Sequence, residues 1–455
     1  MSATPDSALK RGIKTHHATA MVVGTIIGAS IFVQPSEITG PVPSLMGAGL
    51  VWLVAGVLTF FGALVAAELA STFTESGGVY VYLREAFSPL LGFLWGWAMF
   101  WTMHTGIIAA IAMVFARYLG YFFPLGPVGT QLAAVAAILF LSWVNYLGVR
   151  EGSNLQTAFT AAKVLAILLM IAVGFSLGSP HAAVVPDASG VPVGPGAGGT
   201  SLLGGATIQD FLTALVAGLF AFGGWHMVTY NAEETVAPRK TIPRALTLGV
   251  LIVTACYIAL NTVYFYVLPL ETVIASDRVA ADAADVVVGY GGAIMSGLVV
   301  FSTFGAISGI VLAGPRVYFA MSRDRLLFRW VGDVHPVRRT PHRAIWLQGI
   351  WASVLVMTGT YRALFTRVVY TEWIFFGLMA VGLFLLRRHP ELKREYSVWG
   401  YPLIPAVFAL SAFAIVVNQI IADPVESAVG LGFVLLGVPV YFAWARKGYV
   451  KEESV

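Results

Sequence analysis

Gly24-Thr25-Ile26-Ile27-Gly28-Ala29-Ser30-Ile31-Phe32 lies inside one long apolar segment, and Phe220-Ala221-Phe222-Gly223-Gly224-Trp225 lies inside another. Glycine lacks a Cβ, so each stretch marks a place where a membrane helix can unwind. Unwound backbone at membrane depth is tolerated only where it faces protein or a water-filled cavity. Because interrupted spans in corresponding halves of a chain indicate a transporter's central site, the two stretches predict a carrier of a small solute.

The composition places the chain in a lipid bilayer. Of 455 residues, 58% are hydrophobic and 11% charged, whereas about 25% of residues in typical soluble proteins are charged. The net charge of +4 is too small to indicate a nucleic-acid partner, and the single Cys256 excludes a disulfide framework. The chain shows no P-loop, nucleophile–base pair or metal-ligand cluster, so we expect no enzyme activity, cofactor or metal.

The hydrophobic pattern predicts an all-α membrane protein with twelve transmembrane helices. A cytoplasmic tail is expected at 1–16, a single transporter domain at 17–445 and a second cytoplasmic tail at 446–455. The stretch 179–207 reads as an irregular external loop, and 76–88 as an amphipathic segment lying at the inner interface. The spans are expected at 17–39, 46–72, 90–122, 129–148, 155–178, 208–232, 243–269, 289–320, 343–361, 364–387, 402–421 and 426–445.

The distribution of basic residues predicts the orientation. With the N-terminus inside, only Arg278, Arg362 and Arg367 face outward, while Arg117 and Lys163 lie within spans. All the other Lys and Arg residues, of 27 in total, then fall on the cytoplasmic side. This is the positive-inside pattern, so we expect a multi-pass protein of the plasma (inner) membrane with both termini cytoplasmic.

A family resemblance rests on motifs that follow one another in order along the chain. Besides the two glycine-broken stretches, they are Ala67-Glu68-Leu69, Ser76-Gly77-Gly78 and Ala161-Ala162-Lys163. From about residue 18 to 445 the chain resembles the L-type amino acid transporter family of the amino acid–polyamine–organocation superfamily. The resemblance implies a LeuT-type fold, with two inverted repeats of five spans, discontinuous helices one and six, and two additional C-terminal helices. It also implies sodium-independent exchange of neutral amino acids.

The first break is expected to hold the carboxylate of an amino acid substrate. Freed amides at Ala29, Ser30 and Ile31 would begin the second half-helix, where the helix dipole also favours an anion. Gly28 lies directly before them and completes the break. The family usually has glycine at the position of Ser30, so its hydroxyl either narrows the site or adds a donor. The alternative is a kinked helix without a ligand.

Unpaired carbonyls are expected to hold the substrate's ammonium group. Helix breaks free such acceptors at Thr25 and Ile26 in the first break and at Phe220 and Phe222 in the second. Gly223 belongs to the same second turn. Both charged ends of a zwitterion would then be satisfied at a depth where the membrane excludes charge.

Two aromatic residues of the second break are further candidates. Phe220 resembles the family's gate aromatic, which closes over bound substrate from outside; the alternative is an ordinary packing phenylalanine. Trp225 is a possible pocket residue, and a core or interface tryptophan is an equal alternative.

Lys163 lies deep in the fifth span. It is about nine residues from the start of the span, or roughly 13 Å along the helix. In the family, a lysine at this place stands near helices one and eight, where sodium-driven relatives of the fold bind their ion, so Lys163 would replace the ion. The alternatives are a proton carrier and a lysine paired structurally with a carbonyl.

Glu372 in the tenth span is the second unusual charge. The matching family position lines the pocket and is often Asn, so a carboxylate there would contact substrate side chains or titrate. The alternative is a residue near the outer interface that pairs with Arg362 or Arg367.

Polar residues in other spans are possible members of the pocket. His104 and His226 lie deep, although membrane histidines are more often structural than proton-relaying. Ser302 and Ser308 would line its floor near Lys163, with helix packing as the alternative.

Carboxylates at the inner helix ends have a different expected role. Glu68 and Glu233-Glu234 are interpreted as inner-gate or loop-pairing groups for Arg84, Arg150 or Arg239.

Three other functions remain open at this point. A proton-coupled amino acid or amine symporter and a cationic amino acid antiporter would use the same fold. A membrane-embedded redox enzyme subunit would need paired haem ligands, and only His104 and His226 are deep enough.

The expected partners are an amino acid substrate and the lipid bilayer. Animal members of the family commonly bind a single-span glycoprotein through a cysteine in the loop between spans three and four. Here Gly126 stands in that loop, and Cys256 lies within span seven, where we expect it to be buried and inert. We therefore expect no disulfide-linked heavy subunit and a prokaryote-like, stand-alone transporter.

Overall fold

The computed structural model describes residues 12–147, 152–180, 185–186, 192–193, 202–333, 335 and 340–445. Residues 1–11 and 446–455 of the predicted tails, Arg150, and most of the predicted loop 179–207 lie outside this part of the chain. Within that loop the structure describes one antiparallel pair of two-residue strands, β1 (Val185–Pro186) and β2 (Pro192–Val193).

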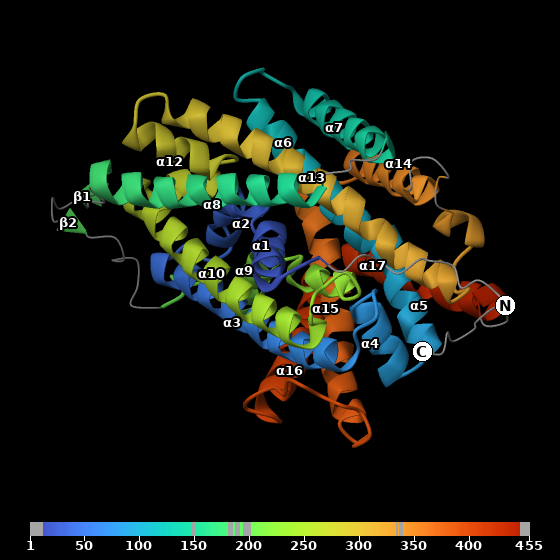
Figure 1. The fold of residues 1–455 in the computed structure, drawn as a ribbon. Helices are drawn as coiled ribbons and strands as arrows, with labels where there is room; N and C mark the ends of the chain where they lie inside the picture. The colour runs from blue at the N-terminus through green and yellow to red at the C-terminus, as the bar shows by residue number, and fades with distance from the viewer. Residues whose placement is uncertain are drawn as a thin grey trace.

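Helical elements make up the first half of the described chain (Figure 1). Here η marks 3-10 helices, except that η2 and η5 are π-helical turns. The elements are α1 (Thr15–Ile26), η1 (Ser30–Phe32), α2 (Gln34–Thr39), α3 (Leu45–Thr72), α4 (Val79–Ala86), α5 (Pro89–Ala98), η2 (Met99–Met103), α6 (His104–Leu119), α7 (Pro127–Leu147) and α8 (Gly152–Leu177).

The second half begins with a well-capped helix, in which Thr207 and Asp210 form a capping box. Its elements are α9 (Ile208–Ala221), η3 (Trp225–Asn231), α10 (Pro238–Val267), α11 (Leu270–Ala275), α12 (Val279–Val287), α13 (Gly291–Arg323), η4 (Arg329–Gly332), α14 (His342–Thr358), α15 (Tyr361–Leu386), α16 (Leu403–Ala422), α17 (Pro424–Val440) and η5 (Tyr441–Ala445).

The helices account for the predicted spans. In the described part of the chain, ten helices are long and apolar enough to cross a bilayer. The first predicted span is α1, η1 and α2 instead, because unwound residues interrupt it. The ninth is α14, whose 17 residues rise about 25 Å. The sixth is interrupted between α9 and η3, so the predicted breaks in helices one and six are both confirmed.

The packing of the helices reveals two equivalent halves. α3 packs against α10, α6 against α13 and α7 against α14, which pairs spans two, three and four with spans seven, eight and nine. α8, the fifth span, packs against α1, α10 and α13, while α15, the tenth, packs against their counterparts α9, α3 and α6. Because each half has five spans, the second enters the membrane from the other side. This is the predicted inverted repeat.

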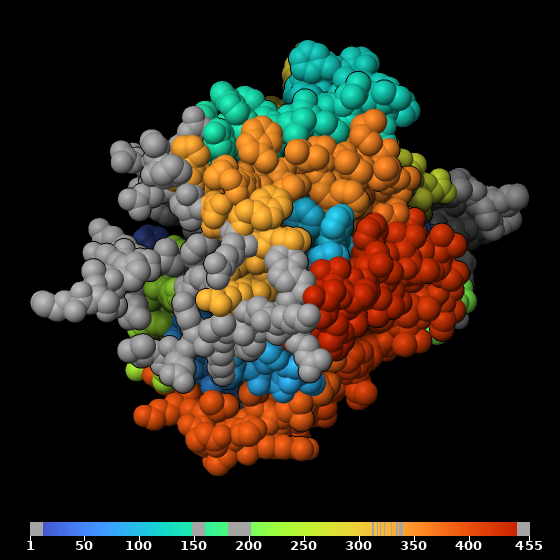
Figure 2. All heavy atoms as spheres, turned by 90° about the vertical axis from the view of Figure 1, so that its right-hand side faces the viewer, coloured from blue at the N-terminus to red at the C-terminus, as the bar shows by residue number. Residues whose placement is uncertain are grey.

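The outer helices expose apolar side chains. Figure 2 shows α17, in red, and α7, in teal, on the molecular surface. Leu132, Phe140 and Trp143 on α7 are about half exposed, and so are Leu435 and Leu436 on α17. Such surfaces suit acyl chains rather than water, so both helices belong to the lipid-facing layer.

We name the side on which α1 begins the N-terminal face. α3 and α15 end there and α10 begins there, since Arg387 binds Glu68, and Ile13 forms a bridge with Thr235. The predicted amphipathic segment 76–88 is α4, but it packs against α5 and α15 and Val79–Arg84 are all buried. Neighbouring helices therefore cover α4, and its position at the inner interface remains a prediction.

Candidate functional site

The first break leaves three consecutive amides without acceptors. α1 ends at Ile26, and Gly28 N donates to the carbonyl of Ile26 at 2.6 Å in a tight turn. The amides of Ala29, Ser30 and Ile31 donate to no acceptor among the described residues. All three residues are buried, so these donors are held in the interior where an anion would satisfy them.

The first break also leaves room beside its backbone. A methyl group added at Gly28 would meet only Ile26 O at 3.8 Å and Ile111 Cδ1 at 4.0 Å. These are ordinary contact distances, so a substrate atom fits next to Gly28 without displacing the protein.

The second break is a closed turn. Gly223 N donates to the carbonyl of Phe220 at 2.9 Å, and Gly224 adopts the left-handed region with φ 88°. Glycine adopts that conformation without strain, which explains the glycine at position 224. η3 continues from Trp225.

The two breaks touch each other. Thr25 Oγ1 donates to the carbonyl of Gly224 at 3.3 Å, and a methyl group on Gly224 would lie 3.3 Å from the carbonyl oxygen of Thr25. Tyr257 of α10 adds a second link, because its hydroxyl lies 2.9 Å from Ile26 O and 3.1 Å from Ala221 O. Sequence reasoning missed Tyr257, since one tyrosine in a long apolar span carries no local signal.

The predicted set of unpaired carbonyls is half right. The carbonyl of Ile26 already accepts from Tyr257 and Gly28, and that of Phe220 accepts from Gly223, so the prediction was wrong for these two. The reason is that the breaks satisfy part of their own backbone through tight turns and through α10. The carbonyls of Thr25 and Phe222 accept from no donor among the described residues.

Phe220 is buried in an aromatic cluster. Its ring lies 5.4 Å from that of Phe365 and 6.4 Å from that of Tyr361, both on α15. The guanidinium of Arg117 lies 4.8 Å above the Tyr361 ring. The cluster joins the second break to α15 on the side away from the N-terminal face, and the gating role of Phe220 remains a prediction.

Lys163 is buried beside the first span. It is 3% exposed, and its Nζ has no hydrogen-bond partner in the described part of the chain. One turn earlier, Thr160 Oγ1 would lie 2.1 Å from a methyl group on Gly24, so α8 and α1 cross closely there. α8 also packs against α13, which places Lys163 on the helix that contacts both predicted neighbours.

Glu372 is a buried carboxyl rather than an interface residue. It is 3% exposed, and Oε1 has no partner among the described residues. The predicted alternative partners are occupied, because Arg362 pairs with Glu37 at 2.5 Å and Arg367 pairs with Glu426. The interface alternative was therefore wrong.

An aromatic enclosure surrounds His226 directly after the second break. Its ring lies 5.0 Å from Phe376, 5.6 Å from both Trp225 and Tyr230, and 5.7 Å from Trp95. Both ring nitrogens are buried without a partner among the described residues.

His104 approaches the same enclosure from the other side. It follows the π-helical turn η2, and its ring lies 6.5 Å from that of Tyr230. Its ring nitrogens are also buried without a described partner. The turn η2 gave no sequence signal, although π-helical turns often occur at functional sites.

The two candidate serines of α13 differ. Ser302 is buried and its hydroxyl has no described partner, whereas Ser308 Oγ accepts from Asn145 Nδ2 of α7 at 3.2 Å. Ser308 therefore contributes to helix packing, and its role in a pocket remains a prediction.

Ion pairs connect elements at the N-terminal face. Arg84 binds Asp324 at 2.6 Å and Glu75 at 2.8 Å, and Tyr80 donates to Asp324. Burial and the Asp324 carboxylate raise the pKa of Tyr80, which keeps its hydroxyl protonated as a donor. Together these contacts join α4 to the end of α13.

Glu68 and Glu233 contact other groups than the arginines predicted for them, while the predicted partner Arg150 lies outside the described residues. Glu68 binds Arg387 at 2.6 Å and accepts from Val398 N at 2.7 Å, while Glu233 accepts from Ser76 N at 3.0 Å. Sequence proximity suggested other arginines, but the fold brings the loop after α15 against α3.

Cys256 is half-buried, not buried as predicted. Ile252, four residues earlier on the same face of α10, is exposed, so this face is turned toward the lipid.

Known proteins are similar to this chain along almost its whole length. The family model described as amino acid permease matches residues 13–443. The Serine/threonine exchanger SteT of Bacillus subtilis is 31% identical over 449 residues, covering 98% of this chain and 99% of the relative. The human b(0,+)-type amino acid transporter 1 is 32% identical, and the match covers 97% of this chain and 91% of the relative. The human Large neutral amino acids transporter small subunit 2 is 32% identical, and the match covers 97% of this chain and 82% of the relative.

Proposed function

This chain belongs to the amino acid permease family, and from that premise we propose that it exchanges neutral L-amino acids by alternating access, without sodium. It is a transporter of the L-type group and not an enzyme. The contact between the two breaks, where Thr25 meets Gly224 beside three free amides, carries the proposal.

The breaks would bind the two charged ends of the substrate. The amides of Ala29, Ser30 and Ile31 are the donors for the carboxylate, and the carbonyls of Thr25 and Phe222 are the acceptors for the ammonium. The printed names of the relatives include serine/threonine exchange and large neutral amino acids, which supports neutral amino acids as the substrate class.

Lys163 would take the place of a coupling ion. A buried ammonium without a described partner, on a helix that contacts α1 and α13, supplies a fixed positive charge behind the first break. Sodium would then not be required.

Two sets of contacts would open in turn. Phe220 with Phe365 and Tyr361 closes one side of the breaks, and Arg84 with Asp324 closes the N-terminal face. Alternating access requires that one set opens while the other holds.

We place the N-terminal face in the cytoplasm of a plasma membrane, since the basic residues gather there. The chain would work alone: its one cysteine, Cys256, lies within α10, so it offers no loop cysteine for a heavy subunit.

The test is transport by proteoliposomes that contain only this polypeptide. We expect uptake of labelled neutral amino acids in sodium-free buffer when unlabelled substrate is inside, and little uptake into empty vesicles. Activity that appears only after addition of sodium or a second membrane protein would contradict the proposal.

The buried carboxyl of Glu372 favours a second candidate, a proton-coupled symporter or a cationic amino acid antiporter. A proton ionophore should stop concentrative uptake by a symporter but leave exchange against internal substrate running. A panel of cationic amino acids tests the antiporter in the same vesicles.

A further inference from the structure

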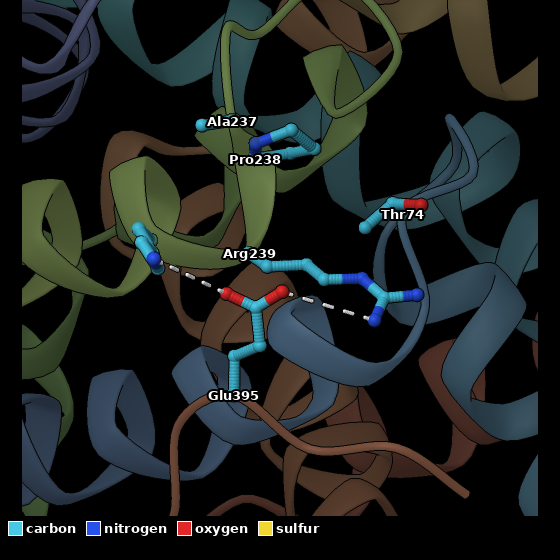
Figure 3. Close-up of a pocket in the computed structure, with 6 residues that line it drawn as sticks. Thr74, Ala237, Pro238, Arg239 and Glu395 are labelled. Atoms are coloured by element: carbon cyan, nitrogen blue, oxygen red, sulfur yellow. Dashed lines mark ion pairs between the residues drawn. The ribbon is translucent and has the colours of Figure 1, made fainter.

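A pocket opens on the N-terminal face, apart from the two breaks. It encloses about 310 Å³ and is lined by Thr74, Ala237, Pro238, Arg239, Lys240 and Glu395 (Figure 3). Thr74 follows α3, Glu395 lies in the loop between α15 and α16, and the other four residues belong to the beginning of α10. Three separate segments of the chain therefore meet in this pocket.

The charges in the pocket are incompletely paired. The carboxylate of Glu395 lies 3.9 Å from Arg239 Nη1 and 4.0 Å from Lys240 Nζ, and Figure 3 marks both ion pairs with dashed lines. Hydrogen bonds from nitrogen to oxygen are normally about 2.7–3.2 Å long, so neither contact is a hydrogen bond. Neither cation donates to another acceptor among the described residues. The pocket thus keeps one excess positive charge and many unused donors.

Above the pocket, one face of α10 changes from basic to apolar. Lys240 and Arg244 are exposed at the beginning of the helix, and Leu248, Leu251 and Ile252 are 49%, 49% and 42% exposed further along. Spacings of three and four residues place all five on the same helix face. Leu248 lies about 12 Å from Lys240 along the axis, a distance that leads from the headgroup region into the hydrocarbon.

We propose that this pocket binds an anionic phospholipid of the leaflet at the N-terminal face. The phosphate group would accept hydrogen bonds from Arg239 and Lys240, and one acyl chain would lie along Leu248, Leu251 and Ile252. A basic pocket at the end of a membrane helix suits such a headgroup. The charge complementarity and the apolar face together favour a lipid over a soluble anion.

Glu395 has the opposite effect from the two cations. Its carboxylate occupies the position between them and repels a phosphate, so it weakens binding. Removing the negative charge should therefore tighten the same site that loses affinity when the cations are removed. A general attraction of the basic face for anionic lipid would not single out this one carboxylate.

The experiment measures lipid binding to the purified full chain by native mass spectrometry, with phosphatidylglycerol and phosphatidylcholine titrated separately. We expect one phosphatidylglycerol to bind about 10-fold more tightly than phosphatidylcholine. The double variant Arg239→Gln/Lys240→Gln should lose this preference, and Glu395→Gln should increase it. The matched control is Arg388→Gln/Lys393→Gln, which removes two exposed charges from the same face outside the pocket and should change nothing.

Three results would overturn the proposal. Equal affinity for the two lipids would exclude a site for anionic headgroups. An equal loss in the pocket variant and the control would indicate general surface charge. Competition by soluble glycerol phosphate at the same concentration as the lipid would identify a soluble phosphate as the ligand. The measurement does not depend on transport, so it stands or fails independently of the proposed function.

Discussion

The two helix breaks differ in how many of their backbone groups are hydrogen-bonded. The first leaves the amides of Ala29, Ser30 and Ile31 without described acceptors, whereas the second bonds Gly223 back to Phe220 and turns through Gly224 in the left-handed region. The first break is thus a donor-rich cradle for an anion, and the second is a rigid turn that positions an aromatic cluster. The structural correspondence between the halves therefore does not imply equal chemistry at their breaks.

The largest expected effect concerns the helix behind the first break. Lys163→Ala should slow exchange on the order of 100-fold, since loss of a charged interaction of about 3 kcal/mol corresponds to that factor. Exchange in proteoliposomes is the measurement, and Lys393→Ala, at an exposed position, is the matched control. If a folded Lys163→Ala protein exchanged substrate at the normal rate, Lys163 would not take the place of a coupling ion.

Glycine substitutions sharpen the comparison between the breaks. Gly224→Ala should lower the thermal unfolding temperature and reduce exchange ~10-fold, because a left-handed alanine costs about 1–2 kcal/mol. Gly28→Ala meets only ordinary contacts, so it should leave the unfolding temperature unchanged and raise KM by filling the substrate's space. Equal effects of both variants on the unfolding temperature would contradict a rigid turn at Gly224 and an open position at Gly28.

The hydroxyl of Tyr257 is one of two side-chain links between the breaks, and its removal tests that link. Tyr257→Phe should reduce exchange about 5-fold, since one hydrogen bond contributes roughly 1 kcal/mol. Tyr264→Phe is the control, because Tyr264 is equally buried on the same helix and its hydroxyl has no described partner. If both variants lose the same activity, the hydroxyl of Tyr257 has no special role.

The smallest expected effect is on selectivity. Glu372→Asn removes a buried carboxyl with an unpartnered oxygen, and should shift preference about 3-fold toward larger, plainly neutral side chains. Competition by a panel of amino acids measures the shift. An unchanged order of preference would separate Glu372 from the substrate.

Glycine placement predicted both breaks, and apolar length predicted the spans, because each depends on local backbone and bilayer physics. The partners of the breaks were not predictable: Tyr257 reaches Ile26 and Ala221 only because α10 packs beside both. The same applies to Glu68, whose arginine Arg387 is far away in sequence. The burial of α4 was missed because its amphipathic pattern fits protein and interface equally well.

The central claim is that the two breaks together bind the charged ends of one amino acid. Competition with exchange by two derivatives of the best substrate tests it most directly, one with an amidated carboxyl group and one with an acetylated amine. We predict that each derivative competes at least ~10-fold more weakly than the parent, since each loses one set of backbone contacts. A derivative that competes as well as the parent would contradict the claim.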